Sequence, residues 1–282
     1  MLSQNNPPQL MGILNVTPDS FSDGGRYLAG DALAARIAEL LADGADIIDV
    51  GGESSRPGAS PVAEEEELAR VLPAVEAIRR VSDIPVSIDT TKAGVARRAL
   101  AAGANIVNDI SALEMDADMT AVLRESGARV VLMHMQGRPR DMQTAPQYDD
   151  VVGEIDAYLA RRIEHLEAAG IPRARMIVDP GLGFGKTTAH NLAILRGLET
   201  FTRHGCPLLI GHSRKRFLGD LTGIPTPGDR DPATALTSVW CANKGADILR
   251  VHNVAATRQA LALWRALEGD ETADEGGARG GA

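Results

Sequence analysis

The chain has 282 residues, of which 44% are hydrophobic and only 3% aromatic, so it is long enough for one large domain or two ordinary ones. Its 29 basic and 38 acidic residues give a net charge of -9, which excludes the broad basic surface of a general nucleic-acid or anionic-membrane binder. Cys206 and Cys241 lack neighbours at ligand spacing, so neither a disulfide framework nor a zinc site is predicted. Residues 1–9 do not resemble a signal peptide, and we expect a soluble, cytoplasmic protein.

Eight short aliphatic runs alternate with amphipathic stretches rich in Ala, Leu, Glu and Arg. The runs predict strands at residues 10–16, 45–50, 84–88, 105–107, 130–133, 176–178, 208–210 and 248–251. The stretches predict helices at residues 31–44, 92–102, 117–126, 150–169, 190–203, 232–244 and 255–267. Two further helices are predicted to begin at a cap at Ser60 and near residue 216. Left-handed helix ends are expected at Gly103, Gly127, Gly170, Gly205 and Gly245.

This eightfold alternation predicts a single (β/α)8, or TIM, barrel of the α/β class over residues 1–268, followed by a disordered tail at 269–282. The strands are followed by polar residues at Asn15, Glu53, Asp89, Asn108, Asp109, His134, Asp179, His212, Lys215, Arg250 and His252. Functional side chains of such barrels lie at the C-terminal ends of the strands, so one site is predicted there. Two long glycine-rich loops, residues 17–25 and 51–59, extend from the same face, and the first is expected to be mobile.

Two carboxylates and an amide follow the third, fourth and sixth predicted strands: Asp89, Asp179 and Asn108. Each of them alone can equally serve as a cap for the helix that follows. Together in one barrel mouth they are costly to dehydrate unless a ligand supplies several N–H donors. A flat heterocycle with amino and ring N–H groups would satisfy them.

The glycine-rich segment DPGLGFGKT at residues 179–187 matches a nucleotide-binding P-loop only in part, because Pro180 stands where GxxxxGK[ST] needs its first glycine. We interpret its glycines as allowing a sharp turn and a close approach to a ligand. Phe184 in this turn either forms a wall for an aromatic ligand or packs locally.

Cationic residues gather after the last two predicted strands. Lys215 leaves the seventh strand, while Arg250 and His252 lie two residues apart on the eighth, and the three predict an anion site. Arg214 and Arg216 can equally bind the ligand or only extend into solvent at the rim.

Asn15 ends the first predicted strand, which adjoins the eighth in a closed barrel. Its amide oxygen can ligate a hard cation such as magnesium, which needs few protein ligands when it binds together with phosphate. No Ser-His-Asp set, Schiff-base lysine or catalytic cysteine is indicated. The site is therefore expected to bind ligands that carry charged groups and flat rings.

Eight segments together resemble the dihydropteroate synthase family: GILNVTPDSFSDGG (12–25), GGESSRPG (51–58), SIDT (87–90), NDI (108–110), LMHMQ (132–136), DPGLGFGK (179–186), SRK (213–215) and RVH (250–252). The resemblance covers residues 8–267, and its first two segments are the most specific. It implies a pterin-binding transferase of folate biosynthesis that condenses 6-hydroxymethyl-7,8-dihydropterin diphosphate with 4-aminobenzoate, giving 7,8-dihydropteroate and diphosphate. It also implies a magnesium cofactor, a homodimer and a target of sulfonamides.

The resemblance implies a role for individual positions. The pterin would be bound by Asp89, Asn108, Ile110, Met133, Asp179, Gly211 and Lys215. The 4-aminobenzoate would be bound by Ser55, Arg56, Pro57, Phe184 and Arg216. The diphosphate would be bound by Asn15, Arg250 and His252, with Asn15 as the magnesium ligand. Catalytic roles would fall to Asp89, Lys215, Arg250 and His252.

The reaction implied by the family is dissociative: diphosphate leaves first, and the neutral aromatic amine then attacks a pterin-stabilised cation without a general base. Three positions depart from the family pattern, with Ser55 replacing Thr, Arg216 replacing a frequent Ser, and Asn253 replacing a frequent Asp. Ser55 keeps the hydroxyl but loses a methyl group, which puts the affinity for aminobenzoate and sulfonamides in question.

Two alternative functions remain open. A methyltetrahydrofolate-type methyltransferase domain shares the pterin slot but has no use for a diphosphate site. A non-catalytic pterin-binding paralogue would be expected to lose one of Asn15, Arg56, Lys215 and His252, all of which are present.

Overall fold

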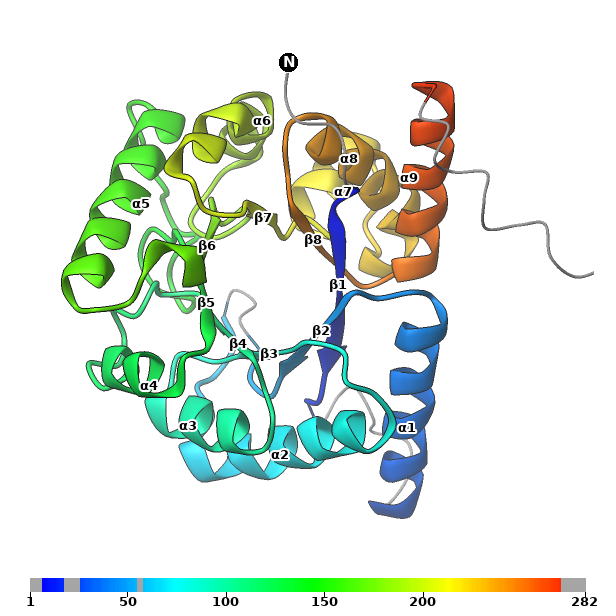
Figure 1. Cartoon of the computed structure of the whole chain (residues 1–282). Coiled ribbons are helices and arrows are strands. Elements are labelled where there is room, and N and C mark those ends of the chain that lie inside the picture. The colour runs from blue at the N-terminus through cyan, green and yellow to red at the C-terminus, as the bar shows by residue number, and fades with distance from the viewer. Residues whose placement is uncertain (1–6, 18–25, 55–57, 270–282) are drawn as a thin grey trace, which may run out of the picture.

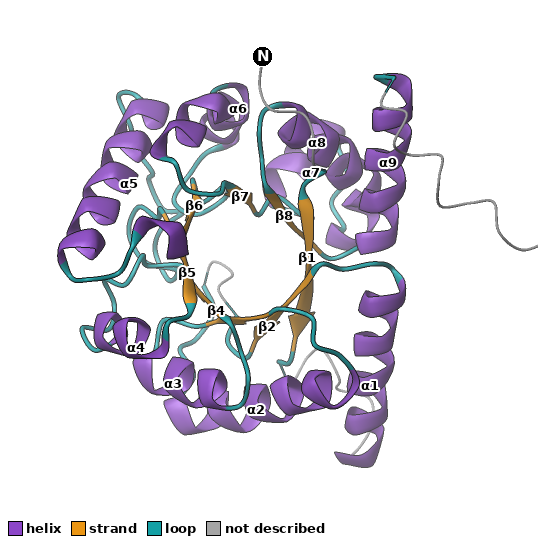
Figure 2. Ribbon diagram, viewed as in Figure 1, coloured by secondary structure: helices purple, strands orange, loops and turns teal. Residues whose placement is uncertain are grey.

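The computed structural model describes residues 7–17, 26–54 and 58–269, which form a ring of parallel strands enclosed by helices (Figures 1 and 2). The strands are β1 (Gln9–Asn15), β2 (Ile47–Gly51), β3 (Val86–Asp89), β4 (Ile106–Asp109), β5 (Arg129–Met133), β6 (Met176–Asp179), β7 (Leu209–Ile210) and β8 (Ile248–Val251). They are hydrogen-bonded in the order β6-β5-β4-β3-β2-β1-β8-β7. A parallel bridge between Val178 and Leu208 joins the two ends of this order. The predicted (β/α)8 barrel is therefore confirmed.

The helices lie outside the ring and follow the strands in turn (Figure 2). They are α1 (Arg26–Ala42), α2 (Glu64–Val81), α3 (Ala93–Ala101), α4 (Met119–Ser126), α5 (Val151–Ala168), α6 (Thr188–Arg196), α7 (Arg216–Thr222), α8 (Asp231–Asn243) and α9 (Val254–Leu267). Short 3-10 turns are η2 (Arg173–Arg175), η3 (Leu198–His204) and η4 (Pro227–Arg230). None of the helices in the described parts of the chain is both long and apolar enough to cross a membrane.

Two apolar layers hold the barrel together because strand side chains alternate between its inside and its outside. The larger layer packs outward-facing residues such as Val50 and Ile88 against the helices. The smaller layer fills the interior and consists of Met11, Ile47, Ile106, Val131, Ile177, Leu209 and Ile248, one from each strand except β3. We call these seven residues the barrel floor. Since each is at most 2% exposed, the floor closes the interior of the barrel.

Three predicted helix boundaries are wrong. The helix expected at residues 31–44 begins earlier, at Arg26, and ends at Ala42. The helix expected to start at Ser60 begins at Glu64, because Ala63 before it is extended, with φ -64° and ψ 149°, and makes no side-chain cap. The backbone N–H of Val62 donates instead to Glu53 Oε1 at 3.3 Å. This bond keeps the residues before Glu64 out of the helix.

The helix predicted at 190–203 is divided at Gly197 into α6 and η3.

The five predicted glycine helix ends all have positive φ, as expected, between 68° at Gly205 and 112° at Gly103. Both cysteines are free and buried. The predicted mobile loop (except residue 17), residues 55–57 of the second loop and the tail from residue 270 lie outside the described residues.

Candidate functional site

A ring of polar side chains stands directly above the barrel floor. Successive inward-facing residues of a strand are two positions apart, so the next level toward the carboxyl ends lies two residues after each floor residue. On β2, β4, β6 and β8 this level holds Asp49, Asn108, Asp179 and Arg250. On β3 it holds Asp89, in register with Asn108 and two residues beyond the inward-facing Ser87. The structure thus brings the predicted Asp89, Asn108 and Asp179 to one level.

Arg250 donates hydrogen bonds to two of these polar groups, and Asn108 joins the same network through Asp49. Arg250 Nε donates to Asp49 Oδ2 at 2.6 Å and its Nη2 donates to Asp89 Oδ2 at 2.8 Å. Asn108 Nδ2 donates to the same Asp49 oxygen at 3.3 Å. Asp49 is fully buried and its Oδ1 has no hydrogen-bond partner among the described residues. One guanidinium therefore compensates two carboxylates at the base of the site.

Lys215 follows β7, the neighbour of β8, and its Nζ lies near both Asp179 and Arg250. A Cβ atom placed on Gly211 would lie 3.8 Å from Asp179 Oδ2, 3.9 Å from Arg250 Cδ and 4.0 Å from Lys215 Nζ. The absence of a side chain at Gly211 thus leaves room between these three groups. Asp179 Oδ1 accepts a hydrogen bond of 2.7 Å from the backbone N–H of Gly181. Lys215 Nζ donates to the carbonyl oxygen of Leu182.

Burial shifts the pKa values of these groups toward their neutral forms. It raises the pKa of Asp89 to about 7, although the nearby Arg250 acts in the opposite direction. It raises the pKa of Asp179 as well, against the effect of Lys215. It lowers the pKa of Lys215 to about 8, with Asp179 opposing. Three ionisable groups with shifted pKa values in one barrel mouth are typical of a functional site.

Arg250 lies on β8, and His252 is the first residue after this strand. Ser213 Oγ lies 2.9 Å from His252 Nδ1 and accepts a hydrogen bond of 3.1 Å from the His252 backbone N–H. Ser213 therefore fixes the orientation of the imidazole. Arg214 forms two hydrogen bonds with Asp231, of 2.6 and 2.8 Å, so its guanidinium is held at the rim.

Arg216 begins α7 with a side chain that is 91% exposed and 3.7 Å from Asp220. Asn253, where the family pattern has Asp, caps α9 by accepting from the Ala256 N–H at 2.9 Å. Its Nδ2 donates to Asp231 Oδ2, also at 2.9 Å. A carboxylate could not make that second bond, so the departure at Asn253 is matched to its neighbour.

Two of the polar residues at strand ends turn away from the mouth. Asp109 is in register with the outward-facing Leu132, and its Oδ1 accepts hydrogen bonds from Ser111. His212 Nε2 lies 2.9 Å from Ser238 Oγ of α8. The expectation that every strand end contributes to one site is therefore corrected, because adjacent residues of a strand face opposite sides.

Several predicted lining residues surround the polar ring. Met133 ends β5 and is 3% exposed, while Ile110 follows β4 and is 9% exposed. The ring of Phe184 lies with its centroid 4.5 Å from Lys215 Nζ, a cation–π contact. The predicted 4-aminobenzoate residues Ser55, Arg56 and Pro57 lie outside the described residues.

Asn15 ends β1 in register with Gly51. A Cβ atom on Gly51 would lie 3.4 Å from Asn15 Oδ1 and 3.8 Å from Asp89 Oδ2. An amide oxygen and a carboxylate oxygen thus approach the same glycine, and both are ligand types that magnesium accepts. Within residues 7–17, 26–54 and 58–269, no three His, Cys, Asp or Glu side chains group as a metal site.

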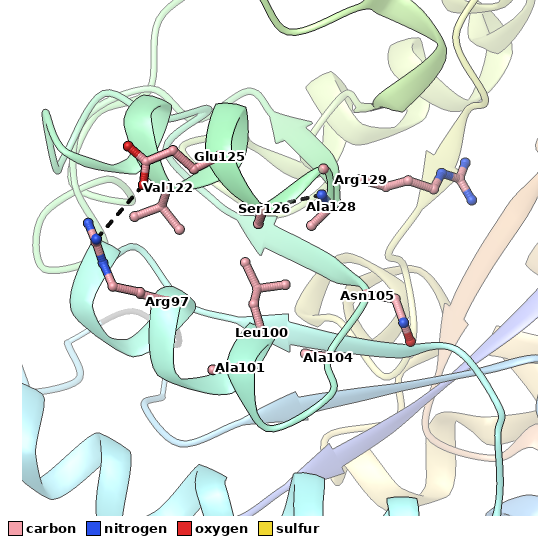
Figure 3. A pocket seen from close by; sticks show the side chains of 11 residues that line it. Arg97, Leu100, Ala101, Ala104, Asn105, Val122, Glu125, Ser126, Ala128 and Arg129 are labelled. Atoms are coloured by element: carbon pink, nitrogen blue, oxygen red, sulfur yellow. Dashed lines mark hydrogen bonds and ion pairs between the residues drawn. The ribbon is translucent and has the colours of Figure 1, made fainter.

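A cavity of about 650 Å³ lies elsewhere, between α3 and α4 (Figure 3). It is lined by Asn105 and Arg129, which lie at the starts of β4 and β5. Arg97 and Glu125 face each other beside it at 4.0 Å. This cavity is at the opposite end of the barrel from the polar ring and contains none of the predicted site residues.

Comparison with known proteins identifies the family. Residues 11–252 match the family model described as pterin binding enzyme. The chain belongs to the pterin-binding enzyme family. This pterin-binding enzyme is 44% identical over 260 residues to a dihydropteroate synthase of Synechocystis, covering 91% of this chain and 90% of the relative. It is 45% identical over 254 residues to that of Escherichia coli, covering 90% and 89%.

Solved structures of dihydropteroate synthases are also similar to this chain. A dihydropteroate synthase of Xanthomonas albilineans with 4-aminobenzoic acid is 46% identical, with a TM-score of 0.88 and coverage of 93% of this chain and 94% of the other. The same enzyme in complex with 7,8-dihydropteroate gives a TM-score of 0.84 at 42% identity, with 95% coverage of both chains. The predicted family and fold of this pterin-binding enzyme are thereby confirmed.

Three residues that the sequence reasoning left out support the site. Asp49 lies inside a strand and not at its end, and only the spacing of two from Ile47 marks it as inward-facing. Ser213 and Lys186 were visible only as parts of motifs, and their contacts with His252 and with the loops above the ring needed the folded chain.

Proposed function

We propose that this protein is a dihydropteroate synthase, which condenses 6-hydroxymethyl-7,8-dihydropterin diphosphate with 4-aminobenzoate in folate biosynthesis. The observation that carries the proposal is the polar ring: Asp89, Asn108 and Asp179 lie at one level above a closed floor, with Lys215 and Arg250 beside them. The family match and the named relatives support the same activity.

The pterin would lie on the barrel floor with its N–H groups toward the acceptors of the ring. Asp89, Asn108 and Asp179 would accept those hydrogen bonds, which compensates the dehydration of their oxygens. Ile110, Met133 and Gly211 would line the slot, because two are buried apolar side chains and the third leaves space. Lys215 would donate to the ring system from beside Asp179.

The diphosphate would lie toward the rim of β8 and β1. Arg250 on β8 and His252 directly after it would bind its oxygens through charge-assisted hydrogen bonds. Arg250 is already held by Asp49 and Asp89, so its guanidinium is placed before the substrate arrives. This placement reduces the reorganisation needed when negative charge develops on the leaving group.

The reaction would be a dissociative substitution at the methylene carbon attached to the pterin. The bond to the diphosphate oxygen breaks, and its electron pair leaves with the diphosphate. The amine nitrogen of 4-aminobenzoate then donates its lone pair to the carbon and releases a proton to solvent. Asp89 would stabilise the cation, while Arg250 and His252 stabilise the departing anion, so electrostatics carry the catalysis.

The 4-aminobenzoate would enter above the pterin. Phe184 would form one wall of its pocket and Arg216, with its exposed guanidinium, would face the carboxylate. Ser55, Arg56 and Pro57 would complete the pocket, and sulfonamides, which share its shape, would compete for it.

Magnesium fits the residues at the end of β1. Asn15 would hold the ion through its amide oxygen, near the carboxylate of Asp89. When bound, the ion neutralises charge on the diphosphate.

A homodimer and a cytoplasmic location belong to the same proposal. The surface of α8 and α9 exposes 73% of Leu236 and 63% of Leu263, apolar area that a second copy of the chain would cover. The free state of Cys206 and Cys241 supports a reducing compartment.

The test is formation of dihydropteroate from purified protein, magnesium, the pterin diphosphate and 4-aminobenzoate. Turnover by the unmodified chain and its loss in Lys215→Ala and Asp89→Asn would support the activity and its site. If the unmodified chain binds the pterin diphosphate but never forms product, the protein is a binding paralogue and the synthase proposal fails.

A further inference from the structure

The turn between β6 and α6 is held by side-chain donors at four consecutive carbonyl oxygens. Leu182 O accepts from Lys215 Nζ, Gly183 O from Gln143 Nε2, Phe184 O from Lys186 Nζ at 2.9 Å, and Gly185 O from Tyr148 Oη at 3.0 Å. Gln143 and Tyr148 come from the segment between β5 and α5. A turn with three left-handed glycines is thereby held by three donors from other segments and by its own Lys186.

Lys186 is the most buried of these donors, with only 3% of the residue exposed. Besides Phe184 O, its Nζ lies 3.1 Å from Nδ1 and 3.4 Å from the carbonyl oxygen of His134, the residue after β5. The three N–H groups of one ammonium thus face three acceptors on two different loops. All three acceptors are uncharged groups, one imidazole nitrogen and two carbonyl oxygens.

Keeping this ammonium buried is costly. Burial lowers the pKa of Lys186 to about 7, with Asp179 opposing the shift. Its surroundings are largely aromatic: the Tyr148 ring centroid lies 6.0 Å from Nζ, and the Tyr158 ring packs edge-on against His134 at 4.9 Å. An apolar side chain would fill the same space without that cost. What the lysine adds is three directed hydrogen bonds between loops.

Those bonds determine where two groups of the candidate site lie. Phe184, whose carbonyl oxygen Lys186 binds, presents its ring to Lys215 with 4.5 Å between centroid and Nζ. Lys215 is also anchored through its bond to Leu182 O in the same turn. A displacement of the turn would therefore move the aromatic wall and the ammonium together.

We propose that Lys186 is a positioning residue that joins the loop after β5 to the turn after β6 and so sets the places of Phe184 and Lys215. The inference rests on the proposed function only for the roles of these two residues, since the contacts of Lys186 do not depend on it. The Nζ of Lys186 is bonded to three protein acceptors, so its effect on the reaction would pass through its neighbours.

The experiment compares Lys186→Met with Lys244→Met. Methionine keeps a similar length but donates no hydrogen bond. Lys244 provides the control because it also lies beside an aromatic ring, 5.6 Å from the Trp240 centroid, and forms an ion pair with Glu199 at 3.1 Å, away from the polar ring. For Lys186→Met, KM for 4-aminobenzoate should rise about 10-fold or more, with a smaller change in the Kd of the pterin diphosphate. Lys244→Met should leave both constants unchanged.

A double-mutant cycle tests whether the effect passes through the wall. If Lys186 acts by placing Phe184, then Lys186→Met should add little to the KM increase of Phe184→Ala. Fully multiplicative effects on KM would overturn the placement of Phe184 by Lys186.

Hydrogen exchange gives a measurement that does not depend on activity. The amides of Gly183 and Phe184 are bonded to Asn191 Oδ1 at 2.8 Å and to Gly181 O at 3.1 Å. They should exchange faster in Lys186→Met and at the original rate in Lys244→Met. Faster exchange in a chain without synthase activity would keep the loop connection and reject the proposed function.

Unchanged exchange and unchanged KM in Lys186→Met would overturn the inference. If that variant does not fold, Tyr148→Phe removes a single donor, to Gly185 O, without a buried charge. It should raise KM for 4-aminobenzoate in the same direction by a smaller factor, and no increase would reject the proposal.

Discussion

Replacement of Gly181 by alanine is the most direct test of how the turn after β6 supports the site. Gly181 has φ of 70° and lies against the loop after β5. A Cβ atom there would lie 1.9 Å from the carbonyl oxygen of His134 and 3.3 Å from Met133 Cγ. Because the nearest atom belongs to the backbone, the two loops must separate by about 1 Å to accept the methyl group.

The size of the effect follows from two contributions. A left-handed conformation costs an L-residue about 1–2 kcal/mol, and overpacking against backbone adds about 1–3 kcal/mol. Gly127→Ala is the matched control, since Gly127 has φ of 73° but a Cβ atom there would meet nothing within 4 Å. Gly181→Ala should therefore lower the free energy of unfolding by about 2–5 kcal/mol, and Gly127→Ala by about 1–2 kcal/mol.

Urea denaturation of both variants and steady-state kinetics give the answer. Since a displacement of about 1 Å at a site can reduce rates about 100-fold, kcat/KM should fall by about that factor in Gly181→Ala alone. Equal loss of stability in the two variants, or wild-type kcat/KM in Gly181→Ala, would refute the argument that loop contact holds the site.

Two further predictions concern charge. As pH rises, kcat/KM should increase near pH 7, where Asp89 loses its proton, and decrease above about 8, where Lys215 loses its charge, because burial raises the first pKa and lowers the second. A pH profile that stays flat through both values would contradict these roles. Asp49→Asn removes the buried partner of Arg250 and should lower the free energy of unfolding by about 3 kcal/mol, the lower end for a broken buried pair, because a second carboxylate still faces the guanidinium. Urea denaturation measures this loss, and an unchanged midpoint would show that the pair is dispensable.

The barrel and most of its polar ring could be predicted from the sequence because strand periodicity carries that information. Ile106 and Asn108, or Ile177 and Asp179, have the spacing of two that puts a floor residue below a ring residue. The same spacing from Ile47 would have found Asp49, but attention to strand ends alone passed over it.

Other features of the fold and the site depend on tertiary contacts that the sequence does not reveal. Ser213 Oγ lies 2.9 Å from His252 Nδ1, although the two residues follow different strands, β7 and β8. The helix expected at Ser60 starts later because Glu53, at the other end of the same connection between β2 and α2, accepts a hydrogen bond from the Val62 amide. Neither contact leaves a local sequence signal, since both join residues that come together only in the fold.

The floor of seven apolar side chains also constrains the order in which ligands bind. Because the floor closes one end of the barrel, ligands have a single opening, and the molecule that binds deepest must enter first and leave last. A pterin seated on the floor would have to be in place before a second molecule settles above it, and the product could depart only once the diphosphate near the opening has cleared. The packing of apolar side chains at one end of the barrel would thus dictate an ordered sequence of substrate binding and product release at the other.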